Sequence, residues 1–463
     1  MRPLKFLIPL FIFIGADVFA QNCDCNREFL HIKKFMENNY AGFKDKLATI
    51  TKPRYDKLIA FYSKYTNGKY AMEKCLLIIT QYLNIFKDQH IQVQPNFDVT
   101  KTDSGFISQR EIINIPDEKI AELQRSKGPE GIYIFRFDSA YKIAVLKTND
   151  PLRDYIGVVV SSKLPGWKKG MLKFEAKKVN DKLYRGVLYM RNHLPKVEGF
   201  DFDKNRIAGD WLREGSVWED IKWPRYVPVG SKKLSDKTFY IKISNFSSAN
   251  AKNIDSLFSA NKEILGTMPN LVLDLRDNGG GADFAFGPIL PYIYTNPLKN
   301  TGVDVLSTDA NIAGWKKTLG DEDIPEDNKR GISRMITVME NNKGRLVNIV
   351  DDETDSSYQP LPFPRKVVIL INKGCASTTE QFLLFARQSS KVILAGENTQ
   401  GTLDYSNMRE ASFECLPYLL NYATTRSRRL DIHQGIDNVG IKPKYYFKTD
   451  TDWIEAAMKL AEQ

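Results

Sequence analysis

A serine at the start of an amphipathic segment is the first residue of this sequence that could do chemistry. Ser377 follows the unbroken apolar run VVILI and precedes Thr378, Thr379 and Glu380. The S-x-x-E spacing of Ser377 and Glu380 is typical of a capping box that opens a helix, and a cap needs no other function. A serine at a helix start also lies where backbone N–H groups and the helix dipole can stabilise an oxyanion. The residues alone leave a helix cap and a nucleophile as alternatives.

An earlier glycine-rich loop has the same setting. The segment LVLDLRDNGGG, residues 271–281, also begins with an unbroken apolar run. Such runs favour strands that are buried on both faces, and the amphipathic segments after both loops favour helices. We therefore predict two βα units of a mostly parallel sheet, with the chemistry beyond the carboxyl ends of its strands. We expect Asp274 and Arg276 to form an ion pair that organises this end of the sheet, without a catalytic role.

Several motifs follow one another in order along the C-terminal half. Asp274, Arg276, Asn278, Gly280 and Gly281 form a D-x-R-x-N-x-G-G segment, Ser377 stands in a small-residue loop, and Gly396, Glu397, Thr399 and Gly401 form a G-E-x-T-x-G segment. In these motifs residues 237–447 resemble the tail-specific, or C-terminal processing, serine peptidases of peptidase family S41. The resemblance implies an α/β catalytic domain of the crotonase/ClpP type that hydrolyses peptide bonds and needs no cofactor.

The resemblance also assigns roles around the nucleophile. It implies that Ser377 attacks the substrate carbonyl and that the backbone amides of Gly280 and Thr378 form the oxyanion hole. Gly280 has a structural alternative, because a glycine often serves only a tight turn. Cys375 is a nucleophile by chemistry, but the motif aligns the serine. We expect Cys375 to be a small buried thiol.

A serine hydroxyl needs a base to become a good nucleophile. Many members of the family place a lysine directly after the last glycine of G-E-x-T-x-G, but this sequence has Thr402 there. The tricorn-type branch instead uses a histidine from the end of an N-terminal helical region and an acid near the chain's end, and His90 and Asp437 match those positions. The resemblance therefore implies a triad of Ser377, His90 as general base and then acid, and Asp437 to orient the imidazole. That branch can also use a further serine beside the histidine. This chain has Gln89 at that position, so a four-residue version of the site is incomplete.

Each proposed partner of the serine has an alternative. His90 can be an ordinary structural histidine, and Asp437 can form a turn with the asparagine that follows it. His433 is a rival base because it stands four residues before Asp437. Lys373 and Lys442 are weaker rivals.

The five cysteines and four histidines bear on metals and disulfides. Cys375 and Cys415 lack the spacing of zinc ligands, so we expect no metal site. Cys23 and Cys25 are too close for an easy mutual bridge, and either of them is a candidate partner for Cys75. The odd number of cysteines leaves at least one free thiol.

The N-terminus predicts export. Arg2 and Lys5 precede an apolar core at residues 6–15, and Ala20 offers a cleavage site. This is the pattern of a signal peptide covering residues 1–20, and the apolar core is too short to span a bilayer. No other apolar run is long enough for a transmembrane segment. The expected destination is the periplasm or the extracellular space.

The mature chain is too long for one ordinary core, so several domains are expected. Helical periodicity predicts a helical domain at 21–100. Apolar and polar residues alternate from about residue 131 to 189, which predicts a β-rich domain at 101–235 without a clear PDZ signature. The catalytic domain is expected at 236–463. It contains a polar insertion at about 300–365 with one expected helix near 327–341, and this insertion is either a lid or substrate-guiding segment or a mobile surface excursion. The formal charge of +10 is spread along the sequence, and no arrangement of basic and aromatic residues indicates nucleic-acid binding.

The sequence therefore predicts an exported serine endopeptidase that acts on peptides or proteins. One alternative is an inactive binding protein that keeps the peptidase scaffold. Two departures from the family pattern favour it: the missing lysine, and Lys444 at a position that is commonly acidic. Another is a hydrolase of non-peptide esters or amides, because an acyl-transfer site does not reveal its leaving group. The oligomeric state does not follow from the sequence.

Overall fold

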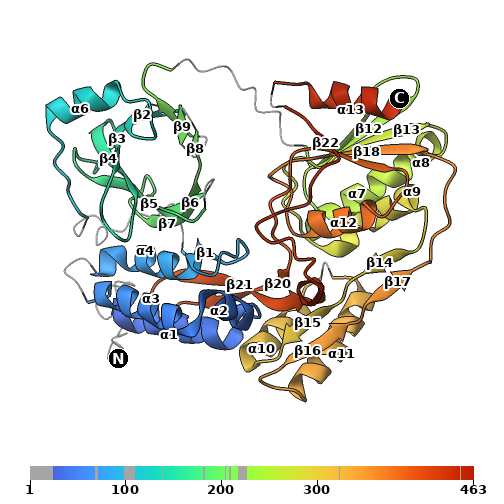
Figure 1. Cartoon of the computed structure of the whole chain (residues 1–463), viewed down its shortest axis with the longest axis horizontal. Helices are drawn as coiled ribbons and strands as arrows, with labels where there is room; N and C mark the ends of the chain where they lie inside the picture. The colour runs from blue at the N-terminus through green and yellow to red at the C-terminus, as the bar shows by residue number, and fades with distance from the viewer. Residues whose placement is uncertain are drawn as a thin grey trace, which may run out of the picture.

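The computed structural model describes residues 24–67, 71–97, 110–137, 139–180, 183–203, 205–207, 210–216, 227–322, 324–448 and 450–463. The predicted signal peptide at 1–20 lies outside these ranges. Within them no helix is long and apolar enough to cross a membrane. Figure 1 shows a bundle of helices and a curled sheet in one half of the molecule, and a helix-flanked sheet with its insertion in the other.

The described residues of the N-terminal part form mainly helices, in the region where the sequence predicts a helical domain. The first helix begins after Asp24, whose side chain accepts the N–H of Asn26 at 2.9 Å and so caps the helix. Apolar side chains of α1, α3 and α4 meet in a continuous core. The helices are α1 (Cys25–Asn39), α2 (Phe43–Ile50), α3 (Lys52–Tyr65) and α4 (Ala71–Asn84).

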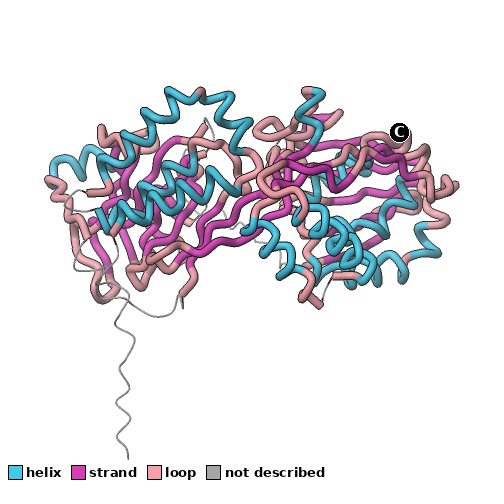
Figure 2. The backbone as a smooth tube through the Cα atoms, turned by 90° about the horizontal axis from the view of Figure 1, so that it is seen from below, coloured by secondary structure: helices cyan, strands magenta, loops and turns pink. Residues whose placement is uncertain are grey.

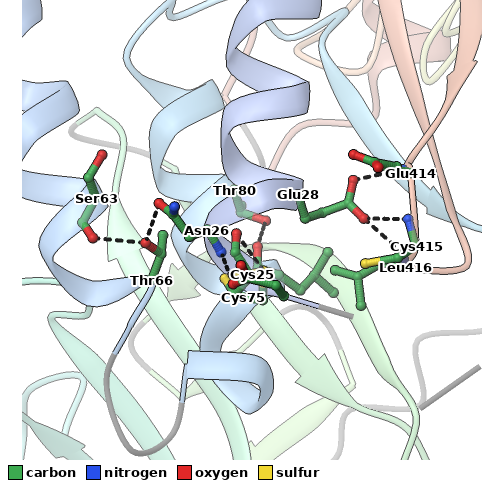
Figure 3. The surroundings of a disulfide bond; sticks show 12 residues. Cys25, Asn26, Glu28, Ser63, Thr66, Cys75, Thr80, Glu414, Cys415 and Leu416 are labelled. Atoms are coloured by element: carbon green, nitrogen blue, oxygen red, sulfur yellow. Dashed lines mark hydrogen bonds between the residues drawn. A yellow bond between two sulfur atoms is a disulfide. The ribbon is translucent and has the colours of Figure 1, made fainter. Parts of the chain in front are cut away.

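A disulfide bond and a group of hydrogen bonds fix this bundle (Figure 3). Cys25 and Cys75 form a disulfide that joins α1 to α4, which confirms one of the two predicted pairings. The buried carboxylate of Glu28 accepts three consecutive backbone N–H groups of residues 414–416, at 2.7 to 2.9 Å. Helix α1 is therefore attached to a turn that lies far away in the sequence.

The β-rich region forms an antiparallel nine-stranded sheet with the order β7-β6-β5-β4-β3-β2-β10-β9-β8. This confirms the alternation predicted for residues 131–189. In Figure 1 the strands curl into a ring beside helix α6 (Asp117–Gln124). The strands are β2 (Gly131–Phe135), β3 (Tyr141–Lys147), β4 (Tyr155–Ser162), β5 (Leu172–Lys178), β6 (Tyr184–Tyr189), β7 (Pro195–Phe200), β8 (Phe202–Asp203), β9 (Arg206–Ile207) and β10 (Trp211–Arg213).

A six-stranded sheet with the order β11-β12-β13-β18-β19-β22 carries both motif loops. Its strands pair in parallel except for β11, which is antiparallel to β12, and this confirms the predicted parallel βα units. The strands are β11 (Val229–Lys233), β12 (Thr238–Ile243), β13 (Asn270–Asp274), β18 (Lys366–Ile371), β19 (Val392–Gly396) and β22 (Tyr445–Tyr446).

Helices cover both faces of this sheet (Figure 1). Side chains of α7 and α12 share an apolar core with one face, and α13 packs on the other face through Trp453, Ala457 and Ala461. Because β13 and β18 are covered on both sides, nearly all of their residues are buried, as the unbroken apolar runs predict. The helices are α7 (Ser248–Ala260), α8 (Lys262–Leu265), α9 (Leu290–Ile293), α12 (Thr378–Ala386) and α13 (Trp453–Glu462), with the 3-10 helix η1 (Asp283–Ile289).

A third sheet joins three distant parts of the sequence. Strand β21 (Tyr418–Ser427) pairs with β20 (Tyr405–Ser412), with β1 (Gln92–Pro95) after the N-terminal helices, and with β15 (Val303–Leu306) of the insertion. Figure 2 shows strands running across the middle of the molecule between its two halves. The remaining elements of the insertion are α10 (Asp309–Thr318), α11 (Glu326–Glu340), β16 (Leu346–Val350), β14 (Leu298–Asn300) and β17 (Glu353–Asp355). Helix α11 confirms the helix predicted near 327–341.

Candidate active site

The parallel pairing of β13 with β18 brings the two motif loops to the same sheet edge. At the end of β13 the carboxylate of Asp274 is buried and pairs with Arg276, with 2.6 Å between Oδ2 and the guanidinium. Tyr240 donates its hydroxyl to the same carboxylate at 2.9 Å. Burial alone would raise the pKa of Asp274, but Arg276 and Lys242 hold it below its ordinary value. The predicted structural ion pair is confirmed.

Ser377 follows β18 and precedes the first residue of α12. Its backbone has φ 56° and ψ −124°, a conformation that residues other than glycine rarely adopt. Such a sharp, strained turn between a strand and a helix is one way to present a serine hydroxyl at a sheet edge. The capping box with Glu380 that the sequence predicts is also present. The cap and the strained turn are therefore two properties of one loop, and the first does not exclude a nucleophile.

Glu380 does more than cap the helix. Its buried carboxylate accepts the N–H of Ser377 at 3.2 Å, the N–H groups of Gly401 and Thr402 at 2.7 and 2.8 Å, and the hydroxyl of Thr399 at 2.5 Å. Burial raises the pKa of Glu380, while these donors act to lower it. The serine loop is thus held against the G-E-x-T-x-G loop by a single side chain.

Gly280 lies directly against the serine loop, as the resemblance predicts. It has φ +98°, and a Cβ at this position would stand 2.9 Å from Cβ of Ser377 and 2.8 Å from the backbone nitrogen of Thr378. Only glycine fits so close an approach. Its own N–H, however, donates to the buried Oδ1 of Asn278 at 3.0 Å. One of the two predicted oxyanion donors therefore has a partner in this structure.

His90 follows the turn after α4 and is half-buried. Its Nδ1 lies 2.6 Å from the backbone carbonyl oxygen of Tyr405, and its own N–H donates to Oδ1 of Asp88 at 2.9 Å. Because a carbonyl oxygen can only accept, Nδ1 carries the proton and Nε2 is left as the acceptor. A general base needs this tautomer, with an unprotonated ring nitrogen available to the nucleophile.

Asp437 makes its contacts with backbone amides. Its Oδ1 accepts the N–H groups of Leu403 and Asp404, both at 2.8 Å. Burial and the neighbouring carboxylates of Asp88 and Asp404 raise the pKa of Asp437 to about 7. The resemblance implies that Asp437 orients the ring of His90. In the structure, the carbonyl of Tyr405 contacts Nδ1 of that ring instead.

One short segment, residues 402–405, contacts all three predicted catalytic residues. The carbonyl of Thr402 accepts the N–H of Ser377 at 3.1 Å, the next two amides donate to Asp437, and the carbonyl of residue 405 holds the ring of His90. The structure therefore gathers Ser377, His90 and Asp437 around one piece of backbone. A carbonyl has no sequence signature, so no motif could have revealed this role.

Asp404 is a second residue that the sequence did not reveal. Its carboxylate is buried, accepts the N–H groups of Ile436 and Asp437 at 2.6 and 2.8 Å, and pairs with Arg429 at 3.3 Å. These bonds fix the loop that carries Asp437. An aspartate directly before a strand is usually a turn residue, so its position offers no clue to this function.

Two buried groups lie close to Ser377 in the fold. Cys375 is a buried free thiol whose Sγ donates to the carbonyl of Leu275 at 3.0 Å, and burial raises its pKa to about 12. The thiol is therefore protonated and a poor nucleophile, as predicted. Thr402, where a lysine would stand, is buried, and its hydroxyl has no hydrogen-bond partner among the described residues.

The three rival bases are exposed. His433 is exposed at the end of the 3-10 helix η2 (Arg428–Ile432), in a left-handed backbone conformation. Lys373 forms an exposed ion pair with Asp201, with 3.3 Å between Nζ and Oδ2, and Lys442 is exposed. Among the described residues no group of three histidine, cysteine or acidic side chains is placed to hold a metal ion.

Ser377 opens onto a cavity of about 660 Å³. The loop after β13 and the start of β20 form part of its lining, and the insertion forms another wall through Trp315, Ile332 and Met335. Thr378, the residue after Ser377, places its hydroxyl 2.8 Å from Oδ1 of Asp283 in the same cavity. The insertion therefore contributes to the space in front of the serine.

Comparisons with known proteins bear on the sequence family and on the fold. Residues 237–447 match the sequence profile described as peptidase family S41. Mature CPAF has a similar structure, with a TM-score of 0.52 at 9% identity over 95% of this chain and 96% of that chain. The complex of mature CPAF with lactacystin gives a TM-score of 0.50 at 9% identity over 95% and 97%. The photosystem II D1 C-terminal processing protease gives 0.41 at 12% identity over 96% and 98%. No curated protein matches the sequence.

Proposed function

Because residues 237–447 of this chain belong to peptidase family S41, we propose that the protein is an exported serine endopeptidase that works through an acyl-enzyme on Ser377. The observation that carries this proposal is the segment 402–405, which contacts Ser377, Asp437 and His90 together. A structural cap at Ser377 would not require a histidine held by its Nδ1 next to the same segment. The expected substrates are peptides or proteins.

In the proposed reaction, Oγ of Ser377 attacks the carbonyl carbon of the scissile bond while Nε2 of His90 takes its proton. The contact between Nδ1 and the carbonyl of Tyr405 keeps the ring in the tautomer that can accept this proton. The imidazolium then gives the proton to the leaving amine. A water attacks the acyl-enzyme in the second half of the reaction, with His90 again as the base.

We assign Asp437 an electrostatic role in this reaction. Its carboxylate lies behind the backbone amides of Leu403 and Asp404, next to the carbonyl that holds His90. When His90 becomes positively charged in the reaction, the ionised carboxylate of Asp437 stabilises that charge. At low pH Asp437 is protonated, and this stabilisation is lost. Asp437 thus supports the base through the segment that orients it.

The oxyanion requires donors aimed at the developing charge. The amide of Thr378 stands at the start of α12, where the helix dipole favours negative charge. Gly280 could add a second donor only if its N–H gives up the contact with Asn278 when substrate binds. We therefore propose Thr378 as the principal donor and Gly280 as one that joins it in the substrate complex.

Export is proposed on two grounds. The N-terminal residues have the composition of a signal peptide, and the disulfide between Cys25 and Cys75 suits an oxidising compartment. The periplasm and the extracellular space both satisfy these observations.

Replacing Ser377 by alanine tests the proposal. We expect hydrolysis of a denatured protein substrate to fall by about a thousandfold or more, because the nucleophile is lost while binding remains. The far-ultraviolet circular dichroism and the melting temperature should stay close to wild type. Hydrolysis at the wild-type rate by the correctly folded Ser377→Ala variant would rule out this mechanism.

A binding protein that keeps the peptidase scaffold is the second candidate. The bond between the N–H of Gly280 and Asn278 favours it, because a site that is ready for catalysis leaves its oxyanion donors open. Such a protein would bind peptides without turnover, and Ser377→Ala would not change its affinity. Measuring peptide binding and ester and peptide turnover on the same preparation separates this candidate, and a non-peptide hydrolase, from the peptidase.

A further inference from the structure

Residues of the curled antiparallel sheet line a cavity of about 500 Å³ that is separate from the cavity at Ser377. Strands that are far apart in the strand order contribute to it: β2 and β10 provide Phe135 and Trp211, and β7 provides Phe200. Figure 1 shows the curled sheet to which these strands belong. Its volume falls within the range of about 300 to 1,000 Å³ that is typical of small-molecule sites.

A buried lysine lines this cavity. Lys173 on β5 is 3% exposed, and its Nζ donates to the carbonyl of Tyr189 at 2.6 Å. The ammonium stands 4.2 Å from the ring centroids of both Tyr141 and Trp167. No carboxylate of the described residues pairs with it. A buried cation without an anion is costly to the fold, so its retention calls for an explanation.

A second cation increases this positive potential. The guanidinium of Arg110 is also buried, and it stacks over Tyr189 and Trp167 at 4.1 and 5.0 Å from the ring centroids. Burial and the charge of Arg110 together place the pKa of Lys173 well below its ordinary value. An anion in the cavity would offset both effects.

A hydroxyl that lacks a hydrogen-bond partner among the described residues belongs to another residue of the cavity lining. The hydroxyl of Tyr141 is buried, and no partner for it exists among the described residues. Tyr141 lines the cavity together with Lys173. Leaving a buried hydroxyl without a partner costs stability, and such exceptions are rare in folded proteins.

We propose that this cavity binds a small organic acid, whose carboxylate accepts hydrogen bonds from Lys173 and Tyr141 and whose apolar body packs against Phe135, Phe200 and Trp211. The carboxylate supplies the anion that Lys173 lacks and the acceptor that the Tyr141 hydroxyl lacks. The aromatic side chains supply the large apolar contact area that a small ligand needs. This site is independent of the peptidase chemistry.

Calorimetric titration with phenylbutyrate, and with phenylbutyramide as the neutral analogue, tests the site. The titrations use the Ser377→Ala variant, so that added peptides stay intact. We expect the acid to bind about tenfold or more tightly than the amide, because a charged hydrogen bond distinguishes them. In Lys173→Met this preference should vanish, and in Tyr141→Phe the acid should bind about threefold more weakly. Lys177→Met, on the same strand but paired with Asp154 at 2.8 Å, should leave binding unchanged.

Three outcomes would overturn the proposal. The first is equal affinity of the acid and the amide for the folded protein. The second is no heat of binding, and no change in tryptophan fluorescence, for either compound at millimolar concentration. The third is tighter binding of the peptide Leu-Leu-Val than of phenylbutyrate, which would show that the cavity binds the C-terminal end of a peptide. If Lys173→Met fails to fold, the Tyr141→Phe variant still tests the site, and unchanged affinity of the acid for that folded variant would count against the proposal.

Discussion

Two buried aspartates near the candidate active site have opposite electrostatic surroundings. Asp274 lies among Arg276, Lys242 and Tyr240, and its pKa is held below the ordinary value despite burial. Asp437 is buried beside the carboxylates of Asp88 and Asp404, and burial together with these charges raises its pKa to about 7. A carboxylate that is neutralised by cations organises a strand end, whereas one that remains among anions is a feature of sites that do chemistry. We therefore expect the cluster around Asp274 to stabilise the fold and the cluster around Asp437 to support the chemistry.

The largest expected effect is a loss of catalytic activity on replacing the proposed base. His90→Ala should lower kcat/KM by about a thousandfold or more, because the serine loses its base. The melting temperature should change little, since His90 is only half-buried. His433→Ala is the matched control and should keep wild-type activity. Equal losses in both variants would show that His90 is not the base.

On the scaffold side we expect a large loss of stability. Asp274→Asn leaves Arg276 and Lys242 without their anion at a buried site. The free energy of unfolding, measured by urea denaturation, should fall by about 2 to 4 kcal/mol, towards the low end for a broken buried pair because Arg276 is partly exposed. Asp201→Asn, which removes an exposed pair with Lys373, should cost less than about 0.5 kcal/mol. Similar losses in the two variants would contradict a scaffold role for Asp274.

A smaller effect is expected for the other aspartate. Asp437→Asn keeps an oxygen that can accept the amides of Leu403 and Asp404 but removes the charge. We predict a fall in kcat of about ten- to a hundredfold with little change in KM, because the imidazolium loses a nearby anion only in the transition state. A rise in KM alone would instead place Asp437 in substrate binding.

The smallest effect is on the pH dependence of stability. The folded pKa of Asp437 lies above its ordinary value of 3.8, so the folded state binds more protons than the unfolded state between about pH 4 and 7. Its contribution to stability therefore falls as the pH rises through this window. Asp274 has the opposite sign, because its lowered pKa contributes stability that is lost as the pH falls below 3.8.

Melting temperatures over this range would separate the two. Asp437→Asn should lose less stability than wild type between pH 4 and 7, and Asp274→Asn should lose less than wild type on acidification below pH 4. Parallel curves for wild type and Asp437→Asn would show that Asp437 titrates normally.

Much of the scaffold could be predicted because burial leaves a clear pattern in the sequence. The apolar runs at β13 and β18 follow from strands that are covered on both faces, and the S-x-x-E pattern marked the start of α12. The disulfide of Cys25 was predictable only as one of two pairings, since spacing does not decide between neighbouring cysteines.

The parts that were not predictable depend on contacts between distant residues. Strand β21 pairs with β1 more than three hundred positions earlier, as Leu420 opposite Val93 illustrates, and no local pattern encodes that pairing. The contact between His90 and the carbonyl of Tyr405 uses backbone, which every residue has. The unpartnered hydroxyl of Tyr141 likewise appears only after the strands have curled around it.

Labelling with a fluorophosphonate, followed by peptide mapping by mass spectrometry, tests the central claim most directly. We expect one adduct in the wild-type protein, on Ser377, formed at least about a hundredfold more slowly in His90→Ala because the nucleophile is no longer activated. Absence of an adduct on Ser377 in the folded wild-type protein, or equal labelling rates in the two proteins, would contradict a serine nucleophile activated by His90.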